Sequence, residues 1–177
     1  MSRTDLPVTR VLERAVDRLI GGASVVSEFL VAGLAVVVSL DAILRWLADW
    51  SFQFVDEIGG YAVLLLSFFG MAIALRRDAL FRVDVLIDRL RTRTRAGLLL
   101  IYDLVALGFA AILCWQLGSL ALRSFDRAIT APTILRTPLW IPQALMACGV
   151  FLLVLVLVVQ IIQRVRQLGP SHPESSL

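Results

Sequence analysis

The sequence lacks the residues on which most catalytic sites depend. It has no Lys and a single His, His172, which lies in a polar segment near the C-terminus. Its two cysteines, Cys114 and Cys148, lie inside apolar runs, which is typical of small packing residues and not of a disulfide framework. A bis-His haem, a His-containing zinc site and a Ser-His-Asp triad each need a His inside the folded part. We therefore expect no catalytic residue, no cofactor and no metal site.

Apolar residues, in contrast, are abundant. They make up 59% of the chain and give a mean hydropathy of +0.85, whereas a soluble domain averages about 45–50%. A core formed by 177 residues cannot bury this excess, but a bilayer can. All basic residues are Arg, and the net charge is +3. This charge is better suited to anionic lipid headgroups than to nucleic acid.

Four stretches are long enough to cross a membrane as helices, which takes about 20 mostly apolar residues each. The sequence thus predicts an all-α membrane domain over 21–166, with spans at about 21–44, 58–75, 97–122 and 139–162. Residues 167–177 are expected to form a disordered cytoplasmic tail. The fourth span is bulky on all sides, so we expect it to be the most lipid-exposed.

The distribution of Arg predicts the orientation. Four Arg precede the first span, seven lie between the second and third spans, and two follow the fourth. The two opposite loops carry one and three. Because Arg-rich segments stay inside, both termini are expected in the cytoplasm. Charged and aromatic residues that mark the membrane boundary are Arg45, Trp46, Arg76, Arg77 and Trp140.

Two amphipathic helices are predicted beside the spans, at about 7–20 and 83–95. In 1–20, apolar residues recur at helical spacing and Arg-rich positions fill the other face. Such a helix is expected to lie in the headgroup plane on the cytoplasmic side. In 83–95, acidic residues come first and Arg last, which suits the helix dipole.

Three acids, Glu28, Asp41 and Asp103, lie within the spans. A charge at the bilayer centre costs at least about 2.5–3.5 kcal/mol, so each acid needs a partner. Asp41 precedes Arg45 by one helical turn, which favours a local ion pair. No Arg is expected at the depth of the other two acids. Both lie near the inner ends of their spans and could reach headgroup water. Otherwise backbone, hydroxyl or partner groups must satisfy them, or they must be protonated.

Small residues align on one face of each of the first three spans, where they permit close helix packing in lipid. Some of these faces must serve the chain's own bundle. We expect a partner on the first two spans near Glu28, while Asp103 stays inside the bundle. The predicted interface consists of Glu28, Ala32, Ala35, Ser39, Gly60, Ser67 and Gly70.

Several short motifs follow one another in a recognisable order. The first span ends in Arg45-Trp46, and the acidic pair Asp56-Glu57 precedes the second span, which ends in Arg76-Arg77. The sequence VDVL follows at 83–86, and TPLWIP stands at 137–142. This order resembles the small membrane subunit (the Q type) of tripartite ATP-independent periplasmic transporters, known as TRAP transporters.

The resemblance implies a non-catalytic subunit in the bacterial inner membrane. Such subunits pair with a large multi-span permease subunit that carries substrate and sodium sites, and a periplasmic binding protein delivers the substrate, usually an organic acid. The small subunit is then a scaffold that helps to dock the binding protein, with Asp56 and Glu57 facing the periplasm.

Two other functions remain open from the residues alone. One is a self-sufficient proton-coupled exporter that uses Glu28 or Asp103 as proton carrier. The strong Arg bias argues against the dual topology of small exporters. The other is an unrelated assembly protein or membrane enzyme, against which the lack of any nucleophile–base spacing counts.

Overall fold

Four long helices dominate the structure, a computed structural model that describes residues 7–48, 53–77, 92–132 and 136–168. They are α1 (Pro7–Ala48), α2 (Gln53–Arg76), α4 (Thr92–Asp126) and α5 (Trp140–Leu168). All four are long and apolar enough to cross a membrane. The predicted all-α fold with four spans is therefore confirmed. Most of the amphipathic segment predicted at 83–95, and nearly all of the predicted tail, lie outside the described residues.

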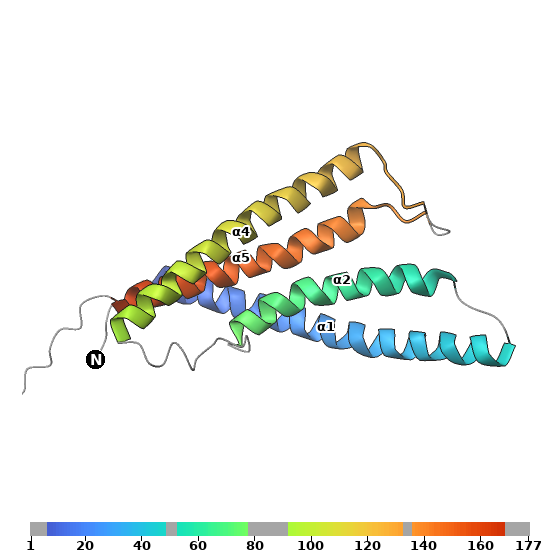
Figure 1. Cartoon of the computed structure of the whole chain (residues 1–177), viewed down its shortest axis with the longest axis horizontal. Helices are drawn as coiled ribbons and strands as arrows, with labels where there is room; N and C mark the ends of the chain where they lie inside the picture. The colour runs from blue at the N-terminus through green and yellow to red at the C-terminus, as the bar shows by residue number, and fades with distance from the viewer. Residues whose placement is uncertain (1–6, 49–52, 78–91, 133–135, 169–177) are drawn as a thin grey trace, which may run out of the picture.

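The helices form two antiparallel hairpins, α1–α2 and α4–α5, which converge at one end of the molecule and splay apart at the other (Figure 1). We name the converging end, where α1 and α4 begin and α2 and α5 end, the terminal end. The opposite end, where each hairpin turns, is the hairpin end. Helix α5 contacts α4, α2 and α1, so it is the element that joins the two hairpins.

The central position of α5 contradicts one expectation from the sequence. The fourth span was expected to be the most exposed to lipid, but 28% of its apolar window is buried inside the bundle, compared with 11% for each of the other spans. Val150, Val156, Leu157 and Val159 are almost fully buried. A helix that is hydrophobic all round suits a central position, because it packs on several neighbours at once. In this helix, bulky apolar residues on all sides therefore indicated burial inside the bundle and not exposure to lipid.

The amphipathic segment at 7–20 is helical, but it is not a separate helix in the headgroup plane. Helix α1 runs without interruption from Pro7 to Ala48, a length of about 63 Å at 1.5 Å per residue. Val16 and Ile20 belong to the same core cluster as Ala72 of α2 and Val156 of α5. Val16 and Ile20 of the apolar face are thus covered by protein, whereas Val11 and Leu19 stay exposed. Packing of the covered residues on α2 and α5 explains why the segment continues α1.

Close packing between α2 and α5 depends on Gly149. A Cβ atom at this position would lie 2.7 Å from Phe68 Cβ and 3.1 Å from Phe69 Cδ1. Real Cβ atoms do not approach other atoms so closely, and the obstacle at Phe68 is the stem of the side chain and not a flexible tip. The glycine therefore allows the two hairpins to touch near mid-span.

Replacing Gly149 with Ala should force α2 and α5 apart and destabilise the chain by about 1–3 kcal/mol, the usual cost of overpacking. Thermal unfolding of the detergent-purified protein measures this effect. Gly108→Ala is the matched control, because a Cβ there meets nothing within 4 Å. The control should be neutral or stabilising, since Ala favours helix. Equal midpoints for the two variants would contradict the close approach at Gly149.

Candidate partner and docking surfaces

Polar side chains connect the helices at the terminal end. Arg76 and Arg77, which the sequence predicts to mark the membrane boundary, reach across to α1. Three hydrogen bonds link α1 to its neighbours: Arg76 Nε to Asp17 Oδ1 (2.8 Å), Arg77 to Ser24 Oγ (3.1 Å) and Gln163 to Glu13 Oε1 (3.0 Å). Arg76 and Asp17 also form an ion pair at 2.7 Å. These contacts fix α1 against α2 and α5.

An ion pair between α4 and α5 corrects the expectation that no Arg lies at the depth of the intramembrane acids. Arg164 Nε lies 2.7 Å from Asp103 Oδ2, and both side chains are about nine-tenths buried. The sequence placed Arg164 at the end of the fourth span, beyond the apolar run. The long Arg side chain and the antiparallel, side-by-side course of the two helices bring its guanidinium to Asp103. Asp103 lies inside the bundle and holds α4 to α5.

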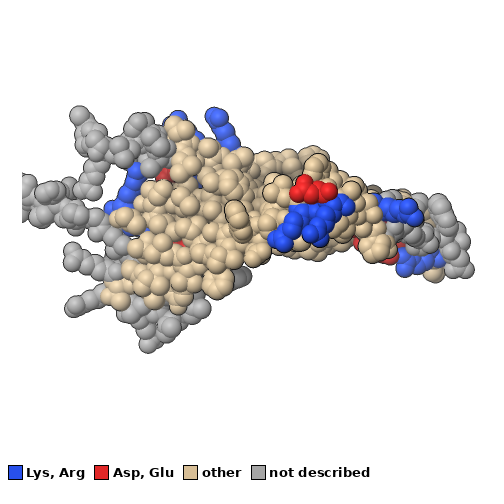
Figure 2. Space-filling view, turned by 90° about the horizontal axis from the view of Figure 1, so that it is seen from above, with Lys and Arg blue, Asp and Glu red and all other residues tan. Residues whose placement is uncertain are grey.

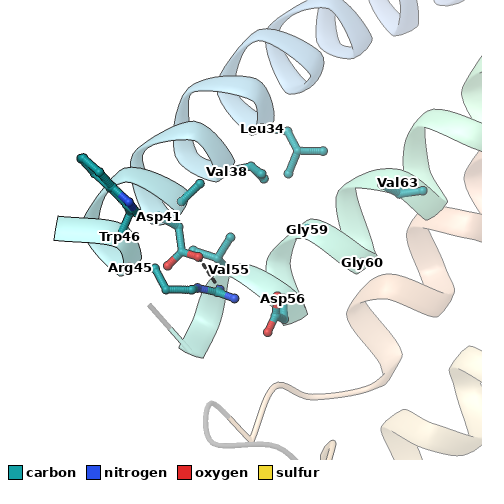
Figure 3. Close-up of a pocket in the computed structure, with 11 residues that line it drawn as sticks. Leu34, Val38, Asp41, Arg45, Trp46, Val55, Asp56, Gly59, Gly60 and Val63 are labelled. Atoms are coloured by element: carbon teal, nitrogen blue, oxygen red, sulfur yellow. Dashed lines mark hydrogen bonds and ion pairs between the residues drawn. The ribbon is translucent and has the colours of Figure 1, made fainter. Parts of the chain in front are cut away.

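An open groove of about 740 Å³ lies between α1 and α2 at the hairpin end. Leu34, Val38, Val55 and Val63 line its apolar part, together with Gly59 and Gly60. Figure 3 shows the charged rim, where Asp41 and Arg45 face each other above the α2 backbone. Their ion pair, at 2.7 Å, is the one predicted from their spacing. The groove thus joins an apolar floor to a charged edge.

The two residues of the acidic pair differ in their surroundings. Asp56 is exposed and lines the groove. Glu57 is half-buried and accepts a hydrogen bond from the Tyr61 hydroxyl at 3.1 Å. Of the two carboxylates, Asp56 is therefore the better placed to contact another protein at the hairpin end.

The turn between α4 and α5 is a second surface at the hairpin end. Two non-glycine residues, Ala128 and Arg136, have left-handed backbones, with φ of 48° and 45°. Thr130 pairs with Pro138 in an isolated β-bridge. Hydrogen bonds from Ala131 N to Thr137 O (2.9 Å) and from Leu139 N to Ile129 O (3.0 Å) hold the turn. Left-handed non-glycine residues cost energy and persist only where the surrounding structure enforces them.

This turn is basic. Arg123, Arg127 and Arg136 are exposed, and Asp126 is the acid among them. Figure 2 views the molecule from the α4 side and shows a group of basic side chains beside an acidic patch, with most of the remaining charged side chains toward the two ends. The two hairpin tips therefore differ in charge: the α1–α2 tip presents Asp56, whereas the α4–α5 tip presents arginines. Counting three Arg against one Asp in this segment would have revealed the contrast from the sequence.

The predicted partner face of α1 is uncovered by the rest of the bundle. Glu28, Ala32, Ala35 and Ser39 are all exposed. Large apolar neighbours on α1 are exposed as well, among them Phe29 at 76% and Val36 at 67%. On α2 the predicted interface residues Gly60 and Ser67 are exposed, and Gly70 is half-buried. Ser67 satisfies its hydroxyl within α2 by donating to the Val63 carbonyl at 2.8 Å.

The two predicted boundary tryptophans lie at the hairpin end in different settings. Trp46 of α1 is 83% exposed, which suits an amphipathic ring at a membrane surface or a protein contact. Trp140, at the start of α5, packs edge-on against Phe125 of α4, with ring centroids 5.5 Å apart. The Trp140 ring therefore also closes the α4–α5 hairpin.

The chain matches a known protein family. Residues 34–167 match the family described as tripartite ATP-independent periplasmic transporters, DctQ component. The matched region covers most of the chain, from the middle of α1 to the end of α5. No curated protein matches the chain.

The ion pair between Asp103 and Arg164 can be tested by comparing a single variant with a double variant. Arg164→Met should leave a buried carboxylate uncompensated and lower the free energy of unfolding by about 3–5 kcal/mol. The double variant Asp103→Asn/Arg164→Met removes both charges and should recover most of that loss. Denaturant unfolding in detergent provides the measurement. A double variant as unstable as Arg164→Met would show that the pair contributes nothing beyond packing.

Proposed function

The chain belongs to the DctQ component family of TRAP transporters, and we propose that, as the small membrane subunit, it is a non-catalytic scaffold for the large permease subunit. Members of this family work with a large permease subunit and a periplasmic binding protein. In our proposal the large subunit carries the substrate and sodium sites and moves an organic acid. The small subunit stays fixed in the inner membrane while the transport domain of its partner moves.

The observation that carries this proposal is the uncovered face of α1. Within its membrane-spanning stretch, large apolar residues and small residues are exposed side by side. Small residues permit close helix approach in lipid, where van der Waals contact has to replace the hydrophobic force. Glu28, Ala32, Ala35 and Ser39 of α1, with Gly60, Ser67 and Gly70 of α2, form the proposed surface for the large subunit.

The hairpin end supports the second part of the proposal, the docking of the binding protein. With both termini in the cytoplasm, as the distribution of Arg predicts, the hairpin end faces the periplasm. Asp56 and the groove beside it would then be accessible to a soluble protein, with Glu57 held behind by Tyr61. On the cytoplasmic side, the arginines of the terminal end would contact anionic headgroups.

The alternative function, a self-sufficient proton-coupled exporter, finds less support. Such a protein needs an acid that gains and loses a proton along a path through the bundle. Asp103 is buried in an ion pair with Arg164 and is therefore not placed along an open path through the bundle. Glu28 lies on the outside of α1, away from the interior of the bundle.

The orientation can be tested with reporter fusions. A reporter fused after Arg166 should be active only in its cytoplasmic form, and one inserted in the α4–α5 turn near Ala131 only in its periplasmic form. Arg-rich segments are retained inside, so one orientation should dominate. Activity of both reporter types at one position would show dual topology and would favour the exporter.

Co-purification with the large subunit tests the proposed interface. The double variant Ala32→Leu/Ala35→Leu should block close helix approach and abolish co-purification, while its amount in the membrane stays at the wild-type level. The matched control is Ala106→Leu/Ala111→Leu, which enlarges two exposed alanines of α4. Normal assembly of the α1 variant, or loss of assembly in the α4 control, would place the interface elsewhere.

A further inference from the structure

Glu28 is an acid on an apolar, uncovered helix face. It lies inside the apolar stretch Val11–Leu47 of α1 and is exposed. Its neighbours Val25, Phe29 and Val31 are 51%, 76% and 55% exposed. Among the residues that the structure describes, none makes a hydrogen bond or ion pair with the Glu28 side chain. Glu28 precedes the residues matched by the family, which begin at residue 34.

The depth of Glu28 follows from its position relative to α2. Ser24 Oγ accepts a hydrogen bond from Arg77, directly after the last residue of α2. Glu28 lies one helical turn, about 6 Å, farther toward the hairpin end. It is therefore level with the apolar part of α2. Arg76 and Arg77, the predicted membrane boundary, lie closer to the terminal end than Glu28 does.

The arginines closest to Glu28 on α2 are already engaged. Arg76 binds Asp17 and Arg77 binds Ser24, and both of these α1 residues lie closer to the terminal end than Glu28 does. A carboxylate at this depth is costly without a donor, because hydrocarbon supplies none. Among the described residues, α1 and α2 thus offer no free donor at this depth, so a charged Glu28 needs one from elsewhere.

We propose that the large permease subunit supplies this donor, as an Arg or Lys side chain that forms an ion pair with Glu28 near the terminal-end membrane boundary. The inference rests on the proposed function and assigns a charge to the partner's side of the interface. Ala32, one turn away, leaves room for a partner helix to approach. An ion pair desolvated between two helices fixes their register, because only one alignment brings the charges together.

Co-purification of the co-expressed complex, through a tag on the small subunit, provides the test. Glu28→Gln should weaken retention of the large subunit by about tenfold or more, and Glu28→Arg should abolish it, since truncating one partner of a desolvated pair leaves the other unpaired. The matched control is Asp126→Asn, which removes an exposed acid at the hairpin end of α4. This control should retain the large subunit as the wild type does.

Charge reversal then identifies the partner residue. In the Glu28→Arg background, each Arg and Lys near the corresponding boundary of the large subunit is changed in turn to Glu, and one of these changes should restore co-purification. Full retention of the large subunit by both Glu28 variants would overturn the inference. If phosphatidylethanolamine in addition protected the isolated wild-type chain against unfolding but not Glu28→Gln, a lipid ammonium group would be the donor instead.

Different results would contradict the assembly with the large subunit and the ion pair of Glu28. If the wild-type chain does not retain the large subunit at all, the proposed function itself is wrong. If the wild type assembles and the Glu28 variants assemble equally well, only the ion pair is wrong. A Glu28 variant that is missing from the membrane when expressed alone would indicate a role in the chain's own folding, and this outcome too would count against the proposed pair.

Discussion

The structure depends on one constraint: a charge or polar group that enters the hydrocarbon region must find its partner within protein, because lipid tails offer none. Asp103 meets this condition through Arg164, and the pair binds α4 to α5. At the terminal end, the bonds from Arg76, Arg77 and Gln163 to α1 serve the same purpose. Pairing the charges therefore also determines which helices stay together.

These contacts make the two ends of the molecule unlike each other. The polar links and the main hydrophobic cluster, with Val16, Ala72 and Val156, gather in the half that contains the terminal end. Toward the hairpin end the two hairpins separate, and each tip has its own character. A molecule whose helices are joined at the terminal end and separated at the hairpin end is suited to a scaffold, because each hairpin tip can contact a different part of a larger assembly.

The sequence predicted the four spans because span length and hydropathy are local properties that the bilayer thickness determines. The ion pair of Asp41 and Arg45 was predictable for the same reason, since its spacing is that of one helical turn. The position of α5 was not predictable, because a helix that is apolar on all sides does not show which face packs on other helices and which face contacts lipid. The contact of Arg164 with Asp103 was missed because two helices far apart in the chain create it.

The continuity of α1 is a second feature that depends on contacts between helices and was therefore not predicted. The change from an amphipathic to a uniformly apolar pattern near Gly21 indicated two helices, whereas packing of Val16 and Ile20 on the bundle keeps one. For the proposed site, the sequence pattern marked the small residues of α1 and α2, and the structure adds that the α1 residues are uncovered. A partner for these residues would be a second chain, and this chain's sequence carries no record of that partner's surface.

The central claim is that this subunit supports transport without carrying it out, and reconstitution into liposomes tests it most directly. Uptake of the organic acid that the binding protein retains is measured under a sodium gradient, with the small subunit alone and with all three components together. The account predicts uptake with the complete set and only background uptake with the small subunit alone. Uptake by the small subunit alone, above that of protein-free liposomes, would contradict it.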